Sequence, residues 1–181
     1  GIMWDFGSDS LSSEILEHYG IDKTIIPEVV KSIGDQGKIS DKISKRYGFN
    51  NKVNITYRTG DQPNNAFSLN VLNPGEIAAT AGTSAVIYSV TDKDIYDSSN
   101  RINTFLHCNH TRSKKRNGLL MCINGSGIAF SWIRKLLNES SYKEMDKKAE
   151  SIDSSEGIYF YSFGNGSERL FKNKKIDSHL I

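Results

Sequence analysis

One stretch of sequence decides the fold: residues Val53 to Tyr88, which read VNITYRTGDQPNNAFSLNVLNPGEIAATAGTSAVIY. Apolar and polar residues alternate over Val53–Tyr57, which predicts a β-strand. Asp61 follows at the tip of this strand, and Pro63 suits the first turn of a helix predicted over Asn64–Leu72. The stretch therefore predicts a carboxylate held at a junction between two rigid elements and facing a cleft.

The second half of the stretch predicts a hairpin with an unusual turn. After the stop signal Asn73-Pro74-Gly75, strands are predicted over Glu76–Ala81 and Ala85–Val90. The turn between them, Gly82-Thr83-Ser84, exposes backbone N–H groups and two hydroxyls, and successive N–H groups can cradle phosphate oxygens. A carboxylate and a phosphate cradle together suggest phosphoryl transfer to a hydroxyl, in which the carboxylate accepts the proton.

Each of these features also has a plain structural interpretation. Asp61 can be the N-cap of the helix that follows it, which is the simpler interpretation of the pattern alone. Gln62 can be a surface residue of that helix, and the Gly82-Thr83-Ser84 turn can be an ordinary hairpin turn. A lone motif of either kind does not decide between these alternatives.

The order of three short motifs does favour the functional interpretation. They are Gly60-Asp61-Gln62, Pro74-Gly75-Glu76 and Gly82-Thr83-Ser84. In this order the chain resembles the sugar kinases of the FGGY family, and among them the xylulokinases. The resemblance implies that Asp61 is the catalytic base, that Gln62 touches the sugar, and that the turn contacts the nucleotide phosphates. Ala85 departs from the family pattern, since many relatives carry a second glycine there.

The resemblance covers nearly the whole chain. Further segments that are similar to the family are Gly1-Ile2-Met3-Trp4-Asp5, Ser12-Ser13-Glu14-Ile15-Leu16, Pro27-Glu28-Val29, Gly37-Lys38-Ile39 and Gly164-Asn165-Gly166-Ser167-Glu168-Arg169. The family's opening phosphate-binding hairpin and its later adenosine loop have no counterpart in the sequence. We therefore expect an internal fragment of such an enzyme, inactive as a kinase by itself.

The implied fold is α/β with a mixed sheet, of the ribonuclease-H-like, actin-like ATPase type. We expect residues 1–72 to form the C-terminal part of the sugar-binding domain, and residues 73–181 the N-terminal part of the nucleotide-binding domain. Capping and apolar periodicity predict helices over Leu11–Tyr19, Ser40–Tyr47, Gly127–Leu137 and from Ser141 to about Ser151. Further strands are predicted over Asn103–Cys108, Leu119–Asn124 and Ile158–Phe163. The three to four consecutive strands that follow Asn73 have loops of hairpin length and are expected to be antiparallel.

The activity that the resemblance implies is ATP-dependent phosphorylation of a sugar hydroxyl, of D-xylulose to D-xylulose 5-phosphate, with ATP and Mg²⁺ as cofactors. Asp61 is the expected base, Asp61 and Gln62 bind the sugar, and Gly82, Thr83 and Ser84 bind the nucleotide. Kinases for ribulose, fuculose, gluconate or glycerol are alternatives within the family. A non-kinase actin-like ATP-binding module is the alternative outside it.

Composition and net charge limit the classes of molecule that we expect the protein to bind. The formal net charge of +2 is too small to indicate nucleic acid or an acidic membrane surface, and no apolar run approaches the roughly 20 residues that span a bilayer. We expect small-molecule partners, a sugar and ATP, and the family analogy allows a homodimer. Two cysteines without CxxC spacing, Cys108 and Cys122, and no signal peptide fit free thiols in a reducing cytoplasm.

Three other clusters have simpler interpretations than a site. His107, Cys108, His110 and Cys122 match no common zinc spacing, and alternate strand residues point to opposite faces. The basic loop Arg112–Arg116 is most simply a solvated hairpin tip. The turn Asn124–Gly127 can bind phosphate at a helix N-terminus, although joining a strand to a helix is the simpler role.

Overall fold

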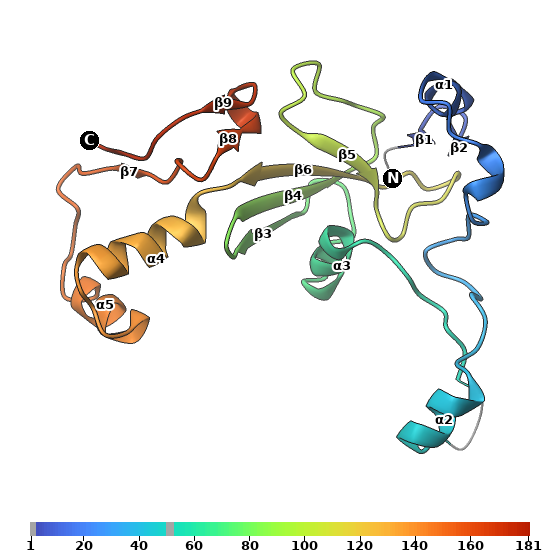
Figure 1. Ribbon diagram of the computed structural model, residues 1–181, viewed down its shortest axis with the longest axis horizontal. Helices are drawn as coiled ribbons and strands as arrows, with labels where there is room; N and C mark the ends of the chain where they lie inside the picture. The colour runs from blue at the N-terminus through green and yellow to red at the C-terminus, as the bar shows by residue number, and fades with distance from the viewer. Residues whose placement is uncertain (1–2, 50–52) are drawn as a thin grey trace. The chain divides into compact units, whose positions relative to one another are not determined.

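The computed structural model describes residues 3–49 and 53–181 (Figure 1). The chain divides into two compact units. Unit 1 comprises Gly1–Glu76, Val90–Asp94 and Phe105–Gly118, and unit 2 comprises Ile77–Ser89, Ile95–Thr104 and Leu119–Ile181. Gly1 and Ile2, which open one of the family-like segments, lie outside the described residues.

Unit 1 begins with short elements whose ends are fixed by local capping. Strands β1 (Trp4–Asp5) and β2 (Ser10–Leu11) pair antiparallel, and helix α1 (Ser13–His18) starts at Ser12, whose hydroxyl accepts a hydrogen bond from the Ile15 amide at 3.2 Å. A 3₁₀ turn covers Lys23–Ile25. Helix α2 (Asp41–Tyr47) follows the same logic as α1, with Ser40 as N-cap and Gly48 in the left-handed conformation as its stop. Both predicted helices are confirmed to within two residues.

The strand predicted over Val53–Tyr57 is wrong as a regular element. This segment is extended and hydrogen-bonds to residues 32–39, but it pairs through two isolated antiparallel bridges, Ile33↔Tyr57 and Lys38↔Asn54. The physical reason lies in the partner segment, where Gly37 has a φ of 102°. That conformation is incompatible with a continuous pleat.

Helix α3 (Asp61–Ser68) begins three residues earlier than predicted and ends before Leu72. Gly60 is its N-cap, and Pro63 occupies the first turn, where its missing N–H costs no helical hydrogen bond. Ala66 is fully buried on the inner face, whereas Leu69 is the C-cap and is 57% exposed. The prediction began the helix after Pro63, whereas Pro63 is its third residue.

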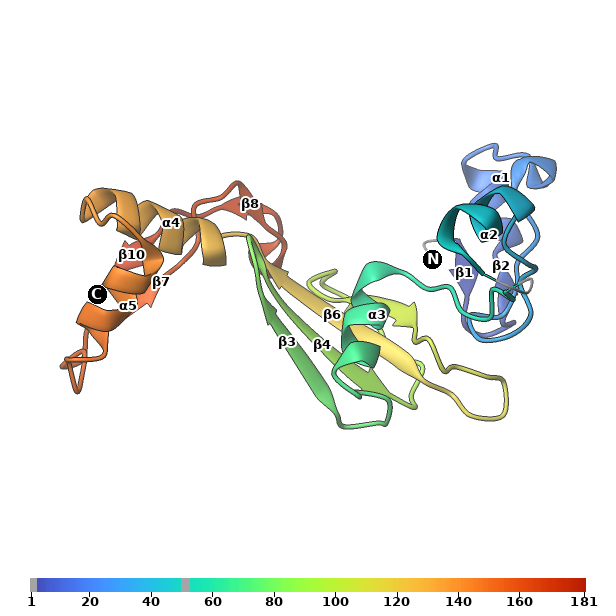
Figure 2. The ribbon, with the colours of Figure 1, turned by 90° about the horizontal axis from the view of Figure 1, so that it is seen from below.

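Four strands form the main sheet: β3 (Ile77–Ala81), β4 (Ala85–Thr91), β5 (Asn103–Leu106) and β6 (Asn117–Ile123). Strands β3 and β4 pair antiparallel from Ile77↔Ser89 to Ala81↔Ala85, so the hairpin prediction is confirmed. The order is β3-β4-β6-β5, and β3, β4 and β6 lie side by side in both views (Figures 1 and 2). Strand β6 lies between β4 and β5, so β4 and β5, which are consecutive in the sequence, are not neighbours in the sheet.

The rest of unit 2 is two helices and short strand pairs. Helix α4 (Ser126–Leu136) and helix α5 (Tyr142–Ala149) lie within one or two residues of their predicted ranges, and the Ser141 hydroxyl caps α5 by accepting from the Glu144 amide. The strand predicted over Ile158–Phe163 is reduced to β7 (Phe160–Tyr161), which pairs with β10 (His179–Leu180). Strands β8 (Ser167–Glu168) and β9 (Lys174–Lys175) flank a 3₁₀ turn, Arg169–Phe171.

Among residues 3–49 and 53–181, no helix combines the length and the apolar composition that crossing a bilayer requires.

Candidate functional site

Asp61 is the first residue of α3, in unit 1. The N-cap is Gly60, so the interpretation of Asp61 as the N-cap is wrong. Its side chain is exposed, and Oδ1 accepts a hydrogen bond from the Gln62 amide at 2.8 Å, while Gln62 itself is half-buried. The geometry thus presents a solvent-facing carboxyl group on the fixed backbone of a helix N-terminus.

The segment that leads into Asp61 is tied to the same helix. The Tyr57 hydroxyl donates a hydrogen bond to Asn64 Oδ1 at 3.0 Å, and the Tyr57 ring lies against Phe67 with 5.4 Å between ring centroids. Burial raises the pKa of the Tyr57 hydroxyl, with the neighbouring Cys108 as the second cause, so Tyr57 remains a neutral donor at neutral pH. These contacts fix the approach of the chain to Asp61.

The Gly82-Thr83-Ser84 turn, in unit 2, is fixed to the N-terminus of α4. Within the turn the Gly82 amide donates to the Ser84 carbonyl oxygen at 3.0 Å. The Thr83 carbonyl oxygen accepts from the amides of Gly127 and Ile128 at 3.1 and 3.4 Å. Gly82 and Thr83 are nevertheless exposed. The turn is therefore rigidly held and keeps a surface open to a ligand, although the Gly82 N–H is already engaged.

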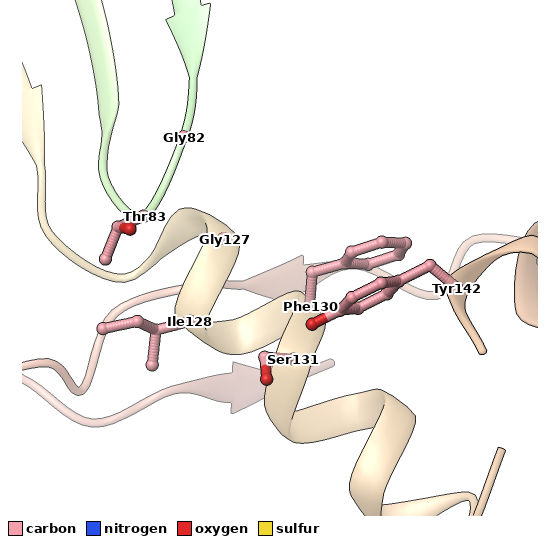
Figure 3. Close-up of a pocket in the computed structure, with 7 residues that line it drawn as sticks. All are labelled: Gly82, Thr83, Gly127, Ile128, Phe130, Ser131 and Tyr142. Atoms are coloured by element: carbon pink, nitrogen blue, oxygen red, sulfur yellow. The ribbon is translucent and has the colours of Figure 1, made fainter. Parts of the chain in front are cut away.

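A pocket of about 410 Å³ opens beside this turn, within unit 2 (Figure 3). Its lining consists of Gly82 and Thr83 from the turn, Gly127, Ile128, Phe130 and Ser131 from α4, and Tyr142 from α5. The volume falls in the range of small-molecule sites, roughly 300–1,000 Å³. The pocket joins a polar turn and a helix N-terminus on one side to aromatic surface on the other.

The aromatic side of the pocket is a stacked pair. Phe130 and Tyr142 lie face to face, with 5.3 Å between centroids and 13° between ring planes (Figure 3). The Arg134 guanidinium lies over the Tyr142 ring at 4.9 Å. A hydrogen bond with Ser131 lowers the pKa of the Tyr142 hydroxyl, and Arg134 lowers it further. The pair provides flat apolar surface with a cation beside it.

Sequence reasoning missed most of this lining. Of the seven residues, Gly82 and Thr83 were predicted as ligand contacts, and Gly127 was left open between binding phosphate and joining elements. Ser131 and Phe130 carry no signal beyond their place in an amphipathic helix. Tyr142 is visible in the sequence only as the residue after a helix N-cap. The structure, in contrast, places the predicted Ser84 half-buried and outside the lining.

The structure also places the His and Cys residues and the basic loop that the sequence analysis considered. Cys108 Sγ lies 3.5 Å from the Nε2 atom of the buried His107, and both cysteines are free. Within the described ranges, no group of three or more His, Cys, Asp or Glu side chains could hold a metal ion. In the basic loop, Arg112 pairs with Asp9 at 2.8 Å and Lys115 pairs with Asp94. Part of that loop's charge is thus paired with carboxylates, while the Arg112 and Lys115 side chains remain exposed to solvent.

Comparison with known proteins finds carbohydrate kinases among both sequences and solved structures. No family model matches the chain. Individual sequences do match: it is 22% identical over 137 residues to a xylulose kinase of Staphylococcus xylosus, covering 76% of this chain and 28% of that one. It is 29% identical over 156 residues to a glycerol kinase of Thermococcus gammatolerans, covering 81% and 29%. The chain thus spans about 30% of the length of these curated relatives.

Solved structures share the fold. The crystal structures of xylulose kinase and of gluconate kinase from Lactobacillus acidophilus each superpose with a TM-score of 0.82 at 18% identity, covering 99% of this chain and 36% of theirs. The expected mixed α/β, actin-like ATPase fold is thereby confirmed. Sequence relatives and shared fold together support the resemblance to the FGGY family of carbohydrate kinases.

Proposed function

We propose that this chain supplies the general base and the phosphate-binding turn of an ATP-dependent sugar kinase. The observation that carries the proposal is the placement of Gly82 and Thr83, the motif residues, on the wall of a 410 Å³ pocket at the N-terminus of α4. Asp61, the other motif residue, is exposed at the N-terminus of α3. Each unit then has one role in the reaction.

Asp61 acts on the sugar. Its carboxylate accepts the proton of the attacking hydroxyl, whose oxygen forms a bond to the γ-phosphorus while the bond to the β–γ bridging oxygen breaks. The exposed position leaves room for a substrate hydroxyl, and the fixed backbone of α3 keeps the carboxylate in place. Gln62, next in the helix, contacts the sugar in this proposal.

The nucleotide belongs in the pocket beside the turn. The fit is good: Thr83 presents a hydroxyl, Gly82 brings backbone to the surface without a side chain, and the helix N-terminus favours anionic oxygens. The stacked Phe130–Tyr142 pair offers apolar surface for the rest of the ligand. When bound, ATP supplies the phosphoryl group and Mg²⁺ neutralises charge on its phosphates. Gly82 and Thr83, which line the pocket, orient those phosphates.

D-xylulose is the substrate we propose, on the strength of the motif resemblance and of xylulose kinases among both sequence and structural relatives. Glycerol and gluconate kinases are also among these relatives, so those substrates, ribulose and fuculose are the alternatives to test. The proposal also assigns residues 1–72 to a sugar-binding domain and residues 73–181 to a nucleotide-binding domain. It further includes a homodimer and a cytoplasmic location.

The test has two parts. First, calorimetry on this chain measures ADP binding, with adenosine as the probe that lacks phosphates; tighter binding of ADP supports the phosphate-binding turn. Second, ADP release is measured with ATP, Mg²⁺ and each of D-xylulose, ribulose, fuculose, gluconate and glycerol, using the longest form of the protein that carries residues 1–181. Turnover with D-xylulose alone supports the proposal in full. Steady ATP hydrolysis that no sugar stimulates contradicts it and favours an ATP-binding module.

A further inference from the structure

The family-like segment at residues 164–169 has no role in the proposed chemistry, yet its glutamate is among the most enclosed side chains in unit 2. Glu168 is 0% exposed. Its two carboxylate oxygens accept from one backbone amide, that of Asn124, at 3.2 and 3.3 Å. A carboxylate is costly to bury, so its retention at a backbone contact calls for a specific function.

The amide that Glu168 holds belongs to the turn that starts α4. Two further hydrogen bonds hold the same turn. Asn124 Nδ2 donates to the Ser167 carbonyl oxygen at 3.0 Å, and Asn165 Nδ2 donates to the Asn124 carbonyl oxygen at 2.9 Å. At Gly125 a Cβ atom would lie 1.6 Å from the Ser162 carbonyl oxygen. Residues 162–168 are therefore packed in direct contact against the backbone of Asn124 and Gly125.

The other end of that turn holds the phosphate-binding turn. Two residues beyond Gly125, the Gly127 amide donates to the Thr83 carbonyl oxygen at 3.1 Å. A Cβ atom at Gly127 would lie 2.1 Å from the Gly82 carbonyl oxygen. A continuous series of backbone contacts thus runs from Glu168 through Asn124 and Gly127 to Thr83.

We propose that Glu168 is a positioning residue for nucleotide binding, which sets the place of the Gly82-Thr83-Ser84 turn through the first residues of α4. This inference rests on the proposed nucleotide site. A hydrogen bond depends on direction as well as distance, so the Asn124–Glu168 contact fixes the position of the α4 N-terminus relative to residues 162–168. The position of Thr83 is fixed in turn, since its carbonyl oxygen is hydrogen-bonded to the N-terminus of α4.

The adjacent Arg169 provides a matched control. Its guanidinium donates to the Asn100 carbonyl and to Asn103 Oδ1, so it fastens the same segment to a different loop, one that does not line the pocket. Arg169→Gln loses long-range contacts in the same way as a Glu168 variant, but it leaves the series from Glu168 to Thr83 intact.

The first experiment needs no ligand. Amide hydrogen exchange is measured by NMR on the chain and on its Glu168→Ala, Glu168→Gln and Arg169→Gln variants. We expect Glu168→Ala to speed exchange of the Gly127 amide roughly ten-fold, because the part-buried Asn124 amide loses its acceptor. Glu168→Gln, which keeps one acceptor oxygen, restores part of the protection and carries the test if the alanine variant does not fold. Unchanged Gly127 exchange in both Glu168 variants overturns the inference.

The second experiment compares ADP with adenosine by calorimetry. A positioning role predicts roughly ten-fold weaker ADP binding in Glu168→Ala, with adenosine affinity and Arg169→Gln unchanged. Equal weakening of both ligands indicates general loss of structure and overturns the inference. Failure of the unmodified chain to prefer ADP counts instead against the proposed phosphate-binding turn, and the exchange experiment still decides the role of Glu168.

Discussion

A side chain of any size at Gly127 would collide with the backbone of Gly82: a Cβ atom built there lies 2.1 Å from the Gly82 carbonyl oxygen and 2.9 Å from its carbonyl carbon. The first turn of α4 and the β3–β4 turn are thus in direct backbone contact, with the Gly127 amide bonded to the Thr83 carbonyl. Both glycines line the pocket. The close approach explains how a turn between two strands becomes part of a ligand site.

Gly127→Ala should destabilise the chain and disturb the pocket. The overlap is with backbone, which cannot rotate away, so we expect a loss of about 1–3 kcal/mol in the free energy of unfolding, measured by urea denaturation. Gly82→Ala is the control, since its nearest contact would be the Ser84 carbonyl at 3.8 Å. That variant should unfold like the parent. Equal stability of the two variants would show that the turn and the helix separate easily.

Asp61→Asn should remove catalysis without affecting the fold. If Asp61 is the general base, turnover falls by roughly 10²–10⁴-fold. The residue is exposed and its contact with the Gln62 amide can be made equally by an asparagine oxygen, so the free energy of unfolding should change by less than about 0.5 kcal/mol. Turnover is measured as ADP release with the preferred sugar.

A control for that variant is Asp41→Asn, because Asp41 is the first residue of α2 as Asp61 is of α3. It should keep full turnover. Retained turnover in Asp61→Asn would exclude Asp61 from the role of base, whatever the control does.

His107 should make stability fall in mild acid. Burial lowers the pKa of the His107 imidazole, with Arg116 as a weaker cause in the same direction, while a backbone contact with Val71 opposes them. In the unfolded chain a histidine takes up its proton near pH 6.5. Below that pH the unfolded state therefore binds more protons, and stability falls by up to about 1.4 kcal/mol per pH unit until the folded pKa is reached.

The measurement is urea denaturation at pH 7.5, 6.5 and 5.5 for the parent and for His107→Gln. The variant has no imidazole at this position, so its stability should depend less steeply on pH across this range. Identical slopes would mean that His107 does not contribute to the acid sensitivity.

The two thiols should differ in reactivity. Cys108 is 3% exposed, and burial raises the pKa of its thiol; Cys122 on β6 is half-buried. Because the thiolate is the reactive form, we expect iodoacetamide at pH 8 to label Cys122 at least roughly ten-fold faster than Cys108. Mass spectrometry of Cys108→Ser and Cys122→Ser variants assigns each rate. Comparable rates in the folded protein would contradict the burial of Cys108.

The sequence by itself determined most of the local elements and indicated the resemblance to the FGGY kinases. Helices α1, α2, α4 and α5 were predicted to within a residue or two because their boundaries are set by neighbours in sequence, such as Ser12, Ser40 and Ser141 as N-caps. The β3–β4 hairpin was equally local, with its three-residue turn. The order and spacing of short motifs carried the resemblance to the FGGY family.

Only the tertiary structure decided the rest. The return of β6 between β4 and β5, the pocket wall of Phe130, Ser131 and Tyr142, and the burial of Glu168 under Asn124 all join residues distant in sequence. Such contacts depend on which surfaces meet after the chain has folded, and no periodicity or capping signal encodes that meeting. The approach of Gly127 to Gly82 shows the reason well: either glycine alone suggests a turn, and their function lies in the backbone contact between them.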